Sequence, residues 1–161
     1  MKLLVFGEIG QLGHELQRRA GDVTLEVRGL EEADFTDPAT CAGFVERTDA
    51  DAVINAVAYT AVDRAEEDEE VALMVNATTP AALARAAAAR GLPLIQVSTD
   101  YVFDGAGDTP FAVDHPTGPL GAYGRTKLAG EEGVIAAGGP HAILRTSWVV
   151  SSHGNNFVKT M

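Results

Sequence analysis

Short apolar runs alternate along the chain with segments of helical pattern, and this alternation constrains the fold more than any other feature. Five runs predict strands: KLLVFG, VTLEV, DAVINAVA, LPLIQVS and HAILRTSW. Their hydrophobicity is continuous rather than alternating, so we expect strands buried on both faces, as in a parallel sheet. Helical segments separate them, at residues 10–21, 38–48, 69–91 and 123–139. Strand followed by helix predicts right-handed βαβ units and a doubly wound α/β domain with three layers, α/β/α.

Glycines and one long loop punctuate this pattern. Gly21, Gly91 and Gly138-Gly139 follow helical segments and are typical of helix ends. Residues 104–119 form the one long expected loop, and loops of that length in compact domains are usually functional. The 161 residues suffice for one domain with a single core.

Charge and cysteine content exclude several functions. The net charge of −11 argues against sequence-independent binding to nucleic acid, which needs clustered Lys and Arg, and against an anionic membrane surface. Cys41 is the only cysteine, so we expect no disulfide, no cysteine-based metal site and a reducing, cytoplasmic setting. The apolar opening stops at Gly7, too early for a signal sequence or a membrane span.

A glycine-rich turn follows the first expected strand. Gly7, Gly10 and Gly13 have G-x-x-G-x-x-G spacing and lead into the first helical segment. Glycines there let the backbone turn tightly and approach a pyrophosphate, and the helix N-terminus supplies free N–H groups and a positive dipole end. The spacing also suits a simple turn, but its strand-turn-helix setting favours dinucleotide binding in a Rossmann-like domain.

The second expected strand ends at Arg28, where dinucleotide folds usually carry an acidic residue for the adenosine ribose. A guanidinium suits a 2′-phosphate better than a bare ribose, so Arg28 favours NADP(H) over NAD(H). Glu26, Glu31 and Glu32 lie nearby in the sequence. An ordinary solvated strand end therefore stays open as the alternative.

Tyr123 and Lys127 lie four residues apart at the start of the last helical segment. One helical turn places the phenol and the ammonium on the same face. We expect the ammonium to lower the pKa of Tyr123 from about 10 toward neutrality, which suits acid/base chemistry at a carbonyl or alcohol oxygen. Such a pair alone also fits an ordinary surface helix, so its meaning depends on its context.

The combination of these motifs resembles the extended short-chain dehydrogenases/reductases, which join an N-terminal G-x-x-G-x-x-G to a Y-x-x-x-K pair and a preceding Ser or Thr. Within that group the chain is similar to the dTDP-4-dehydrorhamnose reductase family. The resemblance covers essentially the whole chain and is carried by STDYVFDG at 98–105, PLGAYGRTKLAGE at 119–131, RTSWVVSSHGNNFVKTM at 145–161, NAVAYTAVDRAE at 55–66 and VNATTPAALA at 75–84. It implies NADPH-dependent reduction of the 4-keto group of dTDP-4-dehydro-6-deoxy-L-mannose to dTDP-L-rhamnose.

The resemblance also implies residue roles. Tyr123 would donate a proton to the substrate's C4 oxygen, Lys127 would bind the nicotinamide ribose, and Thr99 would hold the C4 oxygen, unless Ser98 faces the cleft instead. The other cofactor contacts would be Gly10, Gln11 and Leu12 at the pyrophosphate, Asp34 and Phe35 at the adenine, and Ala58, Tyr59 and Thr60 along the middle, with Asn76 supporting them. The residues facing the sugar nucleotide would be Thr99, Asp100, Tyr101 and Trp148.

The sequence departs from the family pattern in three respects. Val150 stands where the family commonly has Tyr after W-V, and Gly121 where it has Asn in P-L-N-x-Y. Both bear on substrate geometry. Family members continue for well over a hundred residues beyond the segment that matches NNFVKTM. We therefore expect residues 1–161 to form the NAD(P)-binding Rossmann-like domain without the C-terminal substrate lobe.

Two alternative functions remain open. One is a reductase of another nucleotide-linked keto-sugar, and the other is a non-catalytic dinucleotide-binding or regulatory subunit. The intact Thr99, Tyr123 and Lys127 favour an enzyme. We expect a nucleotide-sugar substrate, no metal site, no nucleic acid or membrane partner, and a homodimer as one option for assembly.

Overall fold

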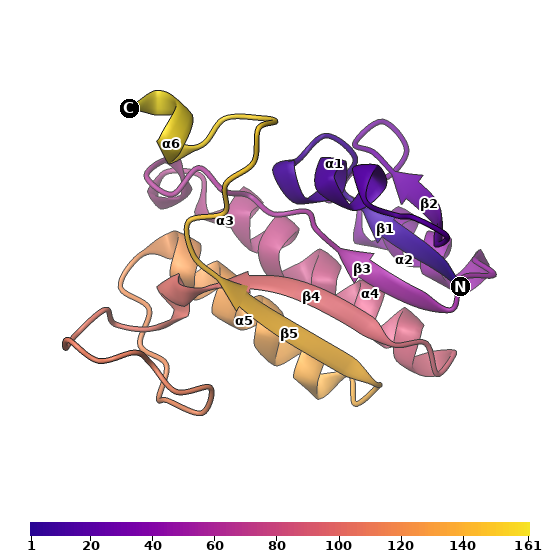
Figure 1. Ribbon diagram of the computed structural model, residues 1–161. Helices are drawn as coiled ribbons and strands as arrows, with labels where there is room; N and C mark the ends of the chain where they lie inside the picture. Colours follow the sequence, from indigo (N-terminus) through magenta and orange to yellow (C-terminus); the bar gives the residue numbers. More distant parts are fainter.

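The computed structural model describes residues 1–161 and contains one parallel sheet of five strands in the order β2-β1-β3-β4-β5 (Figure 1). Every predicted run contributes a strand. The strands are β1 (Lys2–Phe6), β2 (Thr24–Arg28), β3 (Ala52–Asn55), β4 (Leu94–Thr99) and β5 (His141–Thr146). The predicted doubly wound α/β fold is confirmed, because the order reverses after β2 as the chain returns past β1.

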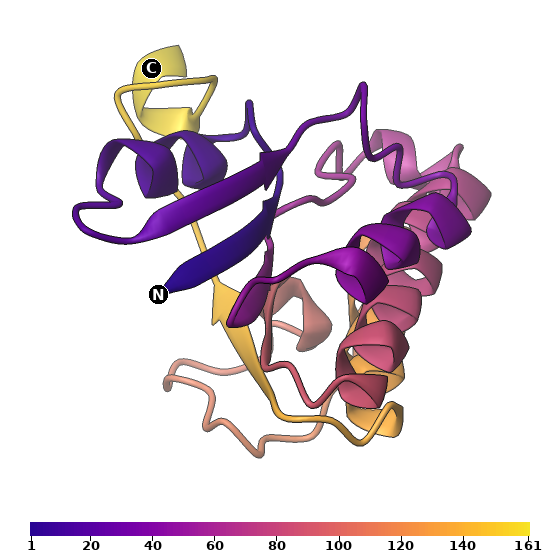
Figure 2. The same ribbon diagram turned by 90° about the vertical axis from the view of Figure 1, so that its right-hand side faces the viewer.

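The helices cover the two faces of the sheet unequally (Figure 2). α1 (Gln11–Arg18) lies alone on one face, while α2 (Pro38–Arg47), α4 (Thr79–Ala89) and α5 (Ala122–Ala136) lie side by side on the other. The remaining elements are short: η1 (Arg64–Glu66), α3 (Glu69–Leu73), η2 (Met74–Thr78), η3 (Asp100–Val102) and α6 (Phe157–Thr160). None of the helices is long and apolar enough to cross a membrane.

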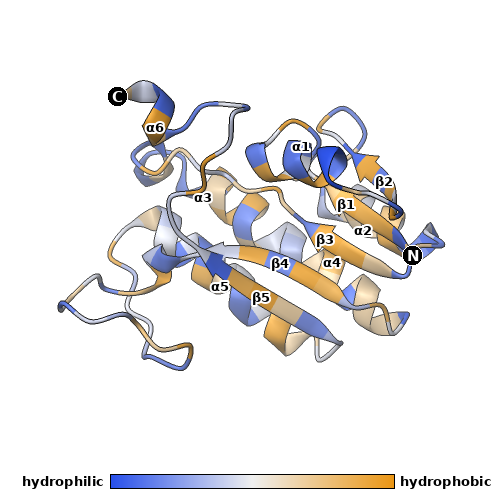
Figure 3. Cartoon of the chain, in the orientation of Figure 1, coloured by the Kyte–Doolittle hydropathy of each residue, from blue (hydrophilic) through white to orange (hydrophobic).

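The core lies between the sheet and the layer of α2, α4 and α5. The strands are largely hydrophobic (Figure 3). The buried cluster joins Leu4, Phe6, Val53 and Leu94 from the strands to Cys41, Val45, Leu83 and Val134 from the helices. Ala84, Ala86 and Ala87 of α4 belong to the same cluster. The outer edge of β5 is unpaired, and half of the Leu144 side chain is exposed.

The long helix predicted at residues 69–91 is interrupted. α3 leads into a π-helical turn, η2, before α4 begins. Pro80 lacks the N–H that a regular helix would direct to the carbonyl group of Asn76, which fits a local change of helix type. The predicted helix ends are as expected, since Gly21, Gly91 and Gly138 all have positive φ.

Candidate active site

The predicted reactive residues meet at the carboxyl ends of β4 and β5. Thr99 ends β4 and pairs with Thr146, the last residue of β5, while Tyr123 lies in the first turn of α5. A cavity of about 280 Å³ opens between them. It is lined by Thr60, Val62, Thr99, Asp100, Tyr101, Tyr123, Thr146, Ser147, Trp148 and Val149.

Hydrogen bonds settle which β4 hydroxyl faces this cavity. Ser98 donates to Glu131 at 2.5 Å, on the α5 side of the sheet. Thr99 lines the cavity, and its Oγ1 accepts from the backbone N–H of Tyr101 at 3.2 Å. Because neighbouring strand residues point to opposite faces, Thr99 and not Ser98 is the hydroxyl available to a ligand there.

Tyr123 departs from expectation in its pKa. Burial raises the pKa of Tyr123 above its usual 10, and the nearby Asp100 and Tyr101 add to this, while the Thr99 side chain acts in the opposite direction. Lys127 does not lower it. The prediction of a depressed pKa is therefore wrong in direction, and Tyr123 is a protonated phenol at neutral pH, suited to donating a proton.

Lys127 explains that difference. Its side chain is buried, and Nζ donates to the carbonyl oxygen of Val97 on β4 at 2.7 Å. Burial lowers the pKa of Lys127 to about 8, and the Glu131 carboxylate opposes that fall. The ammonium thus lies on the same helix face as Tyr123, as predicted, but it is bound to the strand rather than to the phenol.

The glycine turn has the geometry of a dinucleotide site. Gly7 follows β1 with φ of 109°, and Gly13 lies so near it that a Cβ atom would meet the Gly7 carbonyl oxygen. Gly10 precedes α1, whose N-terminus has no side-chain cap. The N–H groups of the first turn, at Gln11, Leu12 and Gly13, are therefore available to an anion.

Arg28 ends β2 as predicted, but its guanidinium is already engaged. It bonds Glu26 at 2.6 Å and Glu32 at 3.2 Å, and it lies over the ring of Phe44. Its Nε is buried without a partner. A 2′-phosphate at this strand end would have to replace the more exposed carboxylate, that of Glu32.

Asn76 holds the segment that follows β3. Its amide accepts from the N–H of Tyr59 at 2.9 Å, donates to the carbonyl oxygen of the same residue, and also donates to Thr126 on α5. Ala58 precedes Tyr59 and is half-buried, and Thr60 reaches the cavity. The π-helical turn therefore fixes this segment against α5.

Asp34 and Phe35 are placed differently from one another. The Asp34 carboxylate is exposed and accepts from the N–H and hydroxyl of Thr36, both at 2.8 Å. Phe35 is 2% exposed, and its ring packs edge-on against Phe6 in the core. The Phe35 ring is therefore part of the core, and of this pair only the Asp34 carboxylate is open to solvent.

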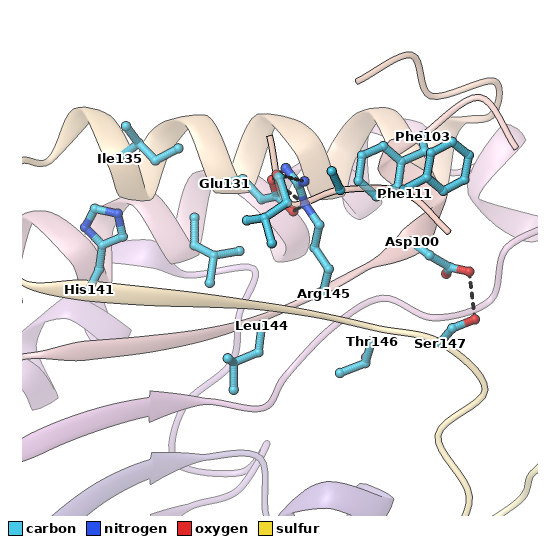
Figure 4. Close-up of a pocket in the computed structure, with 13 residues that line it drawn as sticks. Asp100, Phe103, Phe111, Glu131, Ile135, His141, Leu144, Arg145, Thr146 and Ser147 are labelled. Atoms are coloured by element: carbon cyan, nitrogen blue, oxygen red, sulfur yellow. Dashed lines mark hydrogen bonds and ion pairs between the residues drawn. The ribbon is translucent and has the colours of Figure 1, made fainter. Parts of the chain in front are cut away.

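Trp148 follows β5 in an unusual backbone conformation, with φ of 52°, and its side chain is 71% exposed at the cavity. Its indole packs against Phe157 of α6. Tyr101 meets Tyr123 edge to face, with ring centroids 5.5 Å apart. Asp100 accepts from Ser147 at 2.7 Å, as Figure 4 shows.

The sequence analysis did not select four residues of this cavity: Val62, Thr146, Ser147 and Val149. Their positions after β3 and at the end of β5 are the signal that could have found them, since ligands in open α/β sheets lie at the carboxyl ends of strands.

A larger cavity, about 780 Å³, runs along the free edge of β5 and shares Asp100, Thr146 and Ser147 with the smaller one (Figure 4). No group of His, Cys, Asp and Glu is arranged to hold a metal ion.

Comparison with known proteins places this geometry in context. The dTDP-4-dehydrorhamnose reductase of Salmonella typhimurium is 45% identical over 166 residues, which cover 100% of this chain and 56% of that protein. The reductase structure from Clostridium acetobutylicum superposes with a TM-score of 0.93 at 40% identity, covering 99% of this chain and 57% of that one. The Bacillus anthracis reductase, solved in complex with NADP, gives a TM-score of 0.94 at 33% identity, covering 99% and 57%.

The chain thus spans a little over half the length of these relatives. The family model described as the RmlD substrate binding domain matches residues 1–161, the full length of this sequence. The chain belongs to the RmlD substrate binding domain family.

Proposed function

We propose that this chain contributes the cofactor half and the reacting centre of an NADPH-dependent reductase that converts dTDP-4-dehydro-6-deoxy-L-mannose to dTDP-L-rhamnose. The observation that carries the proposal is that Thr99 and Tyr123 line one cavity, while Lys127 lies one helical turn beyond Tyr123 and is bonded to β4. The glycine turn after β1 adds helical N–H groups that no side chain caps. The names of its relatives, which are dTDP-4-dehydrorhamnose reductases, supply the substrate.

The residues divide the work of ketone reduction. NADPH, when bound, would supply the hydride. Thr99 would hold the substrate's C4 oxygen beside the phenol of Tyr123, which is protonated at neutral pH because burial raises its pKa. Tyr123 would then transfer its proton to that oxygen as negative charge develops there. Lys127 would move from the Val97 carbonyl oxygen toward the nicotinamide ribose, or hold both.

The remaining cavity residues would orient the sugar nucleotide. Trp148 and Tyr101 both offer aromatic surfaces to the cavity, and Asp100 is held by Ser147. Exclusion of water from this opening would strengthen the hydrogen bonds to the reacting oxygen. We propose a cytoplasmic location, as the single buried Cys41 suits a reducing compartment, and a homodimer as the assembly.

For the cofactor we propose NADP(H) in preference to NAD(H). Support comes from Arg28 at the end of β2 and from the relative that was solved with NADP. The ion pair between Arg28 and Glu32 would open to admit the 2′-phosphate. Because the Glu32 side chain is about half exposed, replacing its carboxylate by the 2′-phosphate would cost little free energy.

The decisive experiment follows NADPH oxidation with dTDP-4-dehydrorhamnose, using the intact protein. The proposal requires turnover with this substrate and loss of turnover in Thr99→Ala. The matched control is Thr24→Ala, because Thr24 is an exposed threonine at the start of β2. NADPH binding without any turnover would instead favour a non-catalytic dinucleotide-binding subunit.

A further inference from the structure

A buried carboxylate outside the proposed reacting group joins the elements that carry it. Glu131 lies one helical turn beyond Lys127 on the same face of α5, and it is 2% exposed. A carboxylate is almost never found so deeply buried unless it is paired. Its partners therefore show what it holds.

Both partners lie on the strands of the site. Ser98 of β4 donates to Oε1 at 2.5 Å, and Arg145 of β5 donates through Nε and Nη2, the latter at 2.6 Å to Oε2. Ser98 and Arg145 are paired across the two strands. Figure 4 shows the Arg145 side chain reaching from β5 to Glu131 on α5. One carboxylate therefore ties α5 to β4 and β5 together.

These ties lie next to the groups proposed to react. Ser98 directly precedes Thr99, and pulling the Ser98 hydroxyl toward α5 leaves Thr99 to face the cavity. Lys127 bonds the carbonyl oxygen of Val97, the residue on the other side of Ser98. Thr146, which follows Arg145, donates to the carbonyl oxygen of Ser98.

We propose that Glu131 is a positioning residue, whose carboxylate, held by Ser98 and Arg145, sets the spacing between α5, carrying Tyr123 and Lys127, and the end of β4, carrying Thr99. Glu131 lines the larger cavity along β5, where it is 2% exposed and already bonded to Ser98 and Arg145, and it does not line the small cavity that holds Thr99 and Tyr123. The inference therefore concerns the position of the reacting groups and not direct binding of cofactor or substrate. The expected effect of Glu131 on kcat rests on the proposed reductase activity. Its expected effect on the spacing between α5 and β4 does not.

The test compares Glu131→Gln with Glu132→Gln in the intact protein. The two positions are adjacent on α5, but Glu132 is exposed and serves as the matched control. In Glu131→Gln we expect kcat to fall on the order of 10- to 100-fold, because small misplacement of reacting groups has effects of that size, with little change in KM. Glu132→Gln is expected to match the wild type.

Hydrogen exchange supplies a readout that needs no activity. Amide exchange in peptides covering residues 98–102 should accelerate in Glu131→Gln and stay unchanged in β1 and β2. Uniform acceleration throughout the protein, or kcat within twofold of the control, would overturn the proposal. A wild type without turnover would instead count against the proposed function, while local exchange at residues 98–102 would still decide the role of Glu131.

A second variant guards against misfolding. Ser98→Ala leaves the ion pair between Glu131 and Arg145 intact and removes only the tie to β4. We expect the same local increase in exchange and a smaller fall in kcat. Wild-type exchange and wild-type kcat in Ser98→Ala would show that the carboxylate does not position the end of β4.

Discussion

The ammonium of Lys127 donates to the backbone carbonyl oxygen of Val97 at 2.7 Å, inside a site where the lysine side chain is almost entirely buried. This contact joins α5 to β4 immediately before the strand end that presents Thr99. It also places a charge where water is scarce. The cost of that charge makes both the stability of the protein and its activity depend on pH.

The stability effect follows from the lowered pKa. Burial brings the pKa of Lys127 to about 8 in the folded protein, against 10.5 when it is exposed. Between these values the unfolded chain binds more protons than the folded one, so stability rises with pH. We expect the free energy of unfolding of the wild type, relative to Lys127→Met, to increase by about 3 kcal/mol from pH 8 to pH 10.5.

Urea unfolding at several pH values measures this difference. Lys159→Met is the control, because Lys159 lies on the exposed α6. It measures the effect of removing a lysine ammonium from an exposed helix. A difference for Lys127→Met that stays flat between pH 8 and pH 10.5 would mean that the Lys127 ammonium is solvated in the folded protein.

The rate effect has the opposite sign. The proposed role of Lys127 needs its charge, and that charge is lost as pH rises through about 8. Tyr123, whose pKa is raised above 10, stays protonated over this range. We therefore expect kcat/KM for ketone reduction to decline above about pH 8, and a profile that is level to pH 10 would exclude Lys127 as the titrating group.

Replacing Tyr123 by Phe removes only the phenolic hydroxyl. The ring can keep its edge-to-face contact with Tyr101, so the site should keep its shape. Loss of a general acid typically lowers the rate by roughly 10²- to 10⁴-fold. Single-turnover oxidation of NADPH measures the chemical step, and fluorescence titration should show nearly unchanged NADPH affinity. Normal single-turnover rates would remove Tyr123 from the mechanism.

Gly124 allows α5 to pack against the segment after β4. A Cβ atom at residue 124 would collide with the carbonyl oxygen of Tyr101, and backbone cannot move aside as a flexible side chain can. We expect Gly124→Ala to lower the free energy of unfolding by about 1–3 kcal/mol and to reduce turnover. In the control, Gly118→Ala, the nearest atom is 3.5 Å away and little change is expected. Equal melting temperatures for the two variants would contradict this packing.

The sequence predicts the fold well because its signals are local and repeated. The five apolar runs predict all five strands, and the glycines after the helical segments predict where helices end. The spacing of the first glycines predicts the turn after β1. Other features depend on neighbours distant in sequence. Burial of Phe35 and the raised pKa of Tyr123 follow from packing that no short motif encodes.

The same limit applies to hydrogen bonds that join distant segments. Which of Ser98 and Thr99 faces the cavity depends on the bond from Ser98 to Glu131, 33 residues further along the chain. The π-helical turn is likewise explained by bonds from Asn76 to Tyr59 and Thr126. Sequence spacing shows which residues share a helix face, but not which strand carbonyl oxygen or carboxylate they meet.

Arg28 and Glu32 give the most direct test of cofactor preference. If Arg28 binds the 2′-phosphate, Glu32 competes with that phosphate for the guanidinium, which it contacts at 3.2 Å. Glu32→Gln should therefore raise the affinity for NADPH and leave that for NADH nearly unchanged, whereas Arg28→Asp should reverse the preference. The expected gain is small, roughly two- to fivefold, because exposed ion pairs contribute at most about 1 kcal/mol.

Fluorescence titration of both reduced cofactors on the same preparations measures these affinities. Glu31→Gln is the control, because Glu31 is an exposed neighbour that makes no ion pair with Arg28. Equal gains for NADPH and NADH in Glu32→Gln would indicate a general charge effect. Tighter binding of NADH than NADPH by the wild type would show that Arg28 stays paired with Glu26 and Glu32 when the cofactor binds. The strand end would then recognise the ribose hydroxyls instead of a 2′-phosphate.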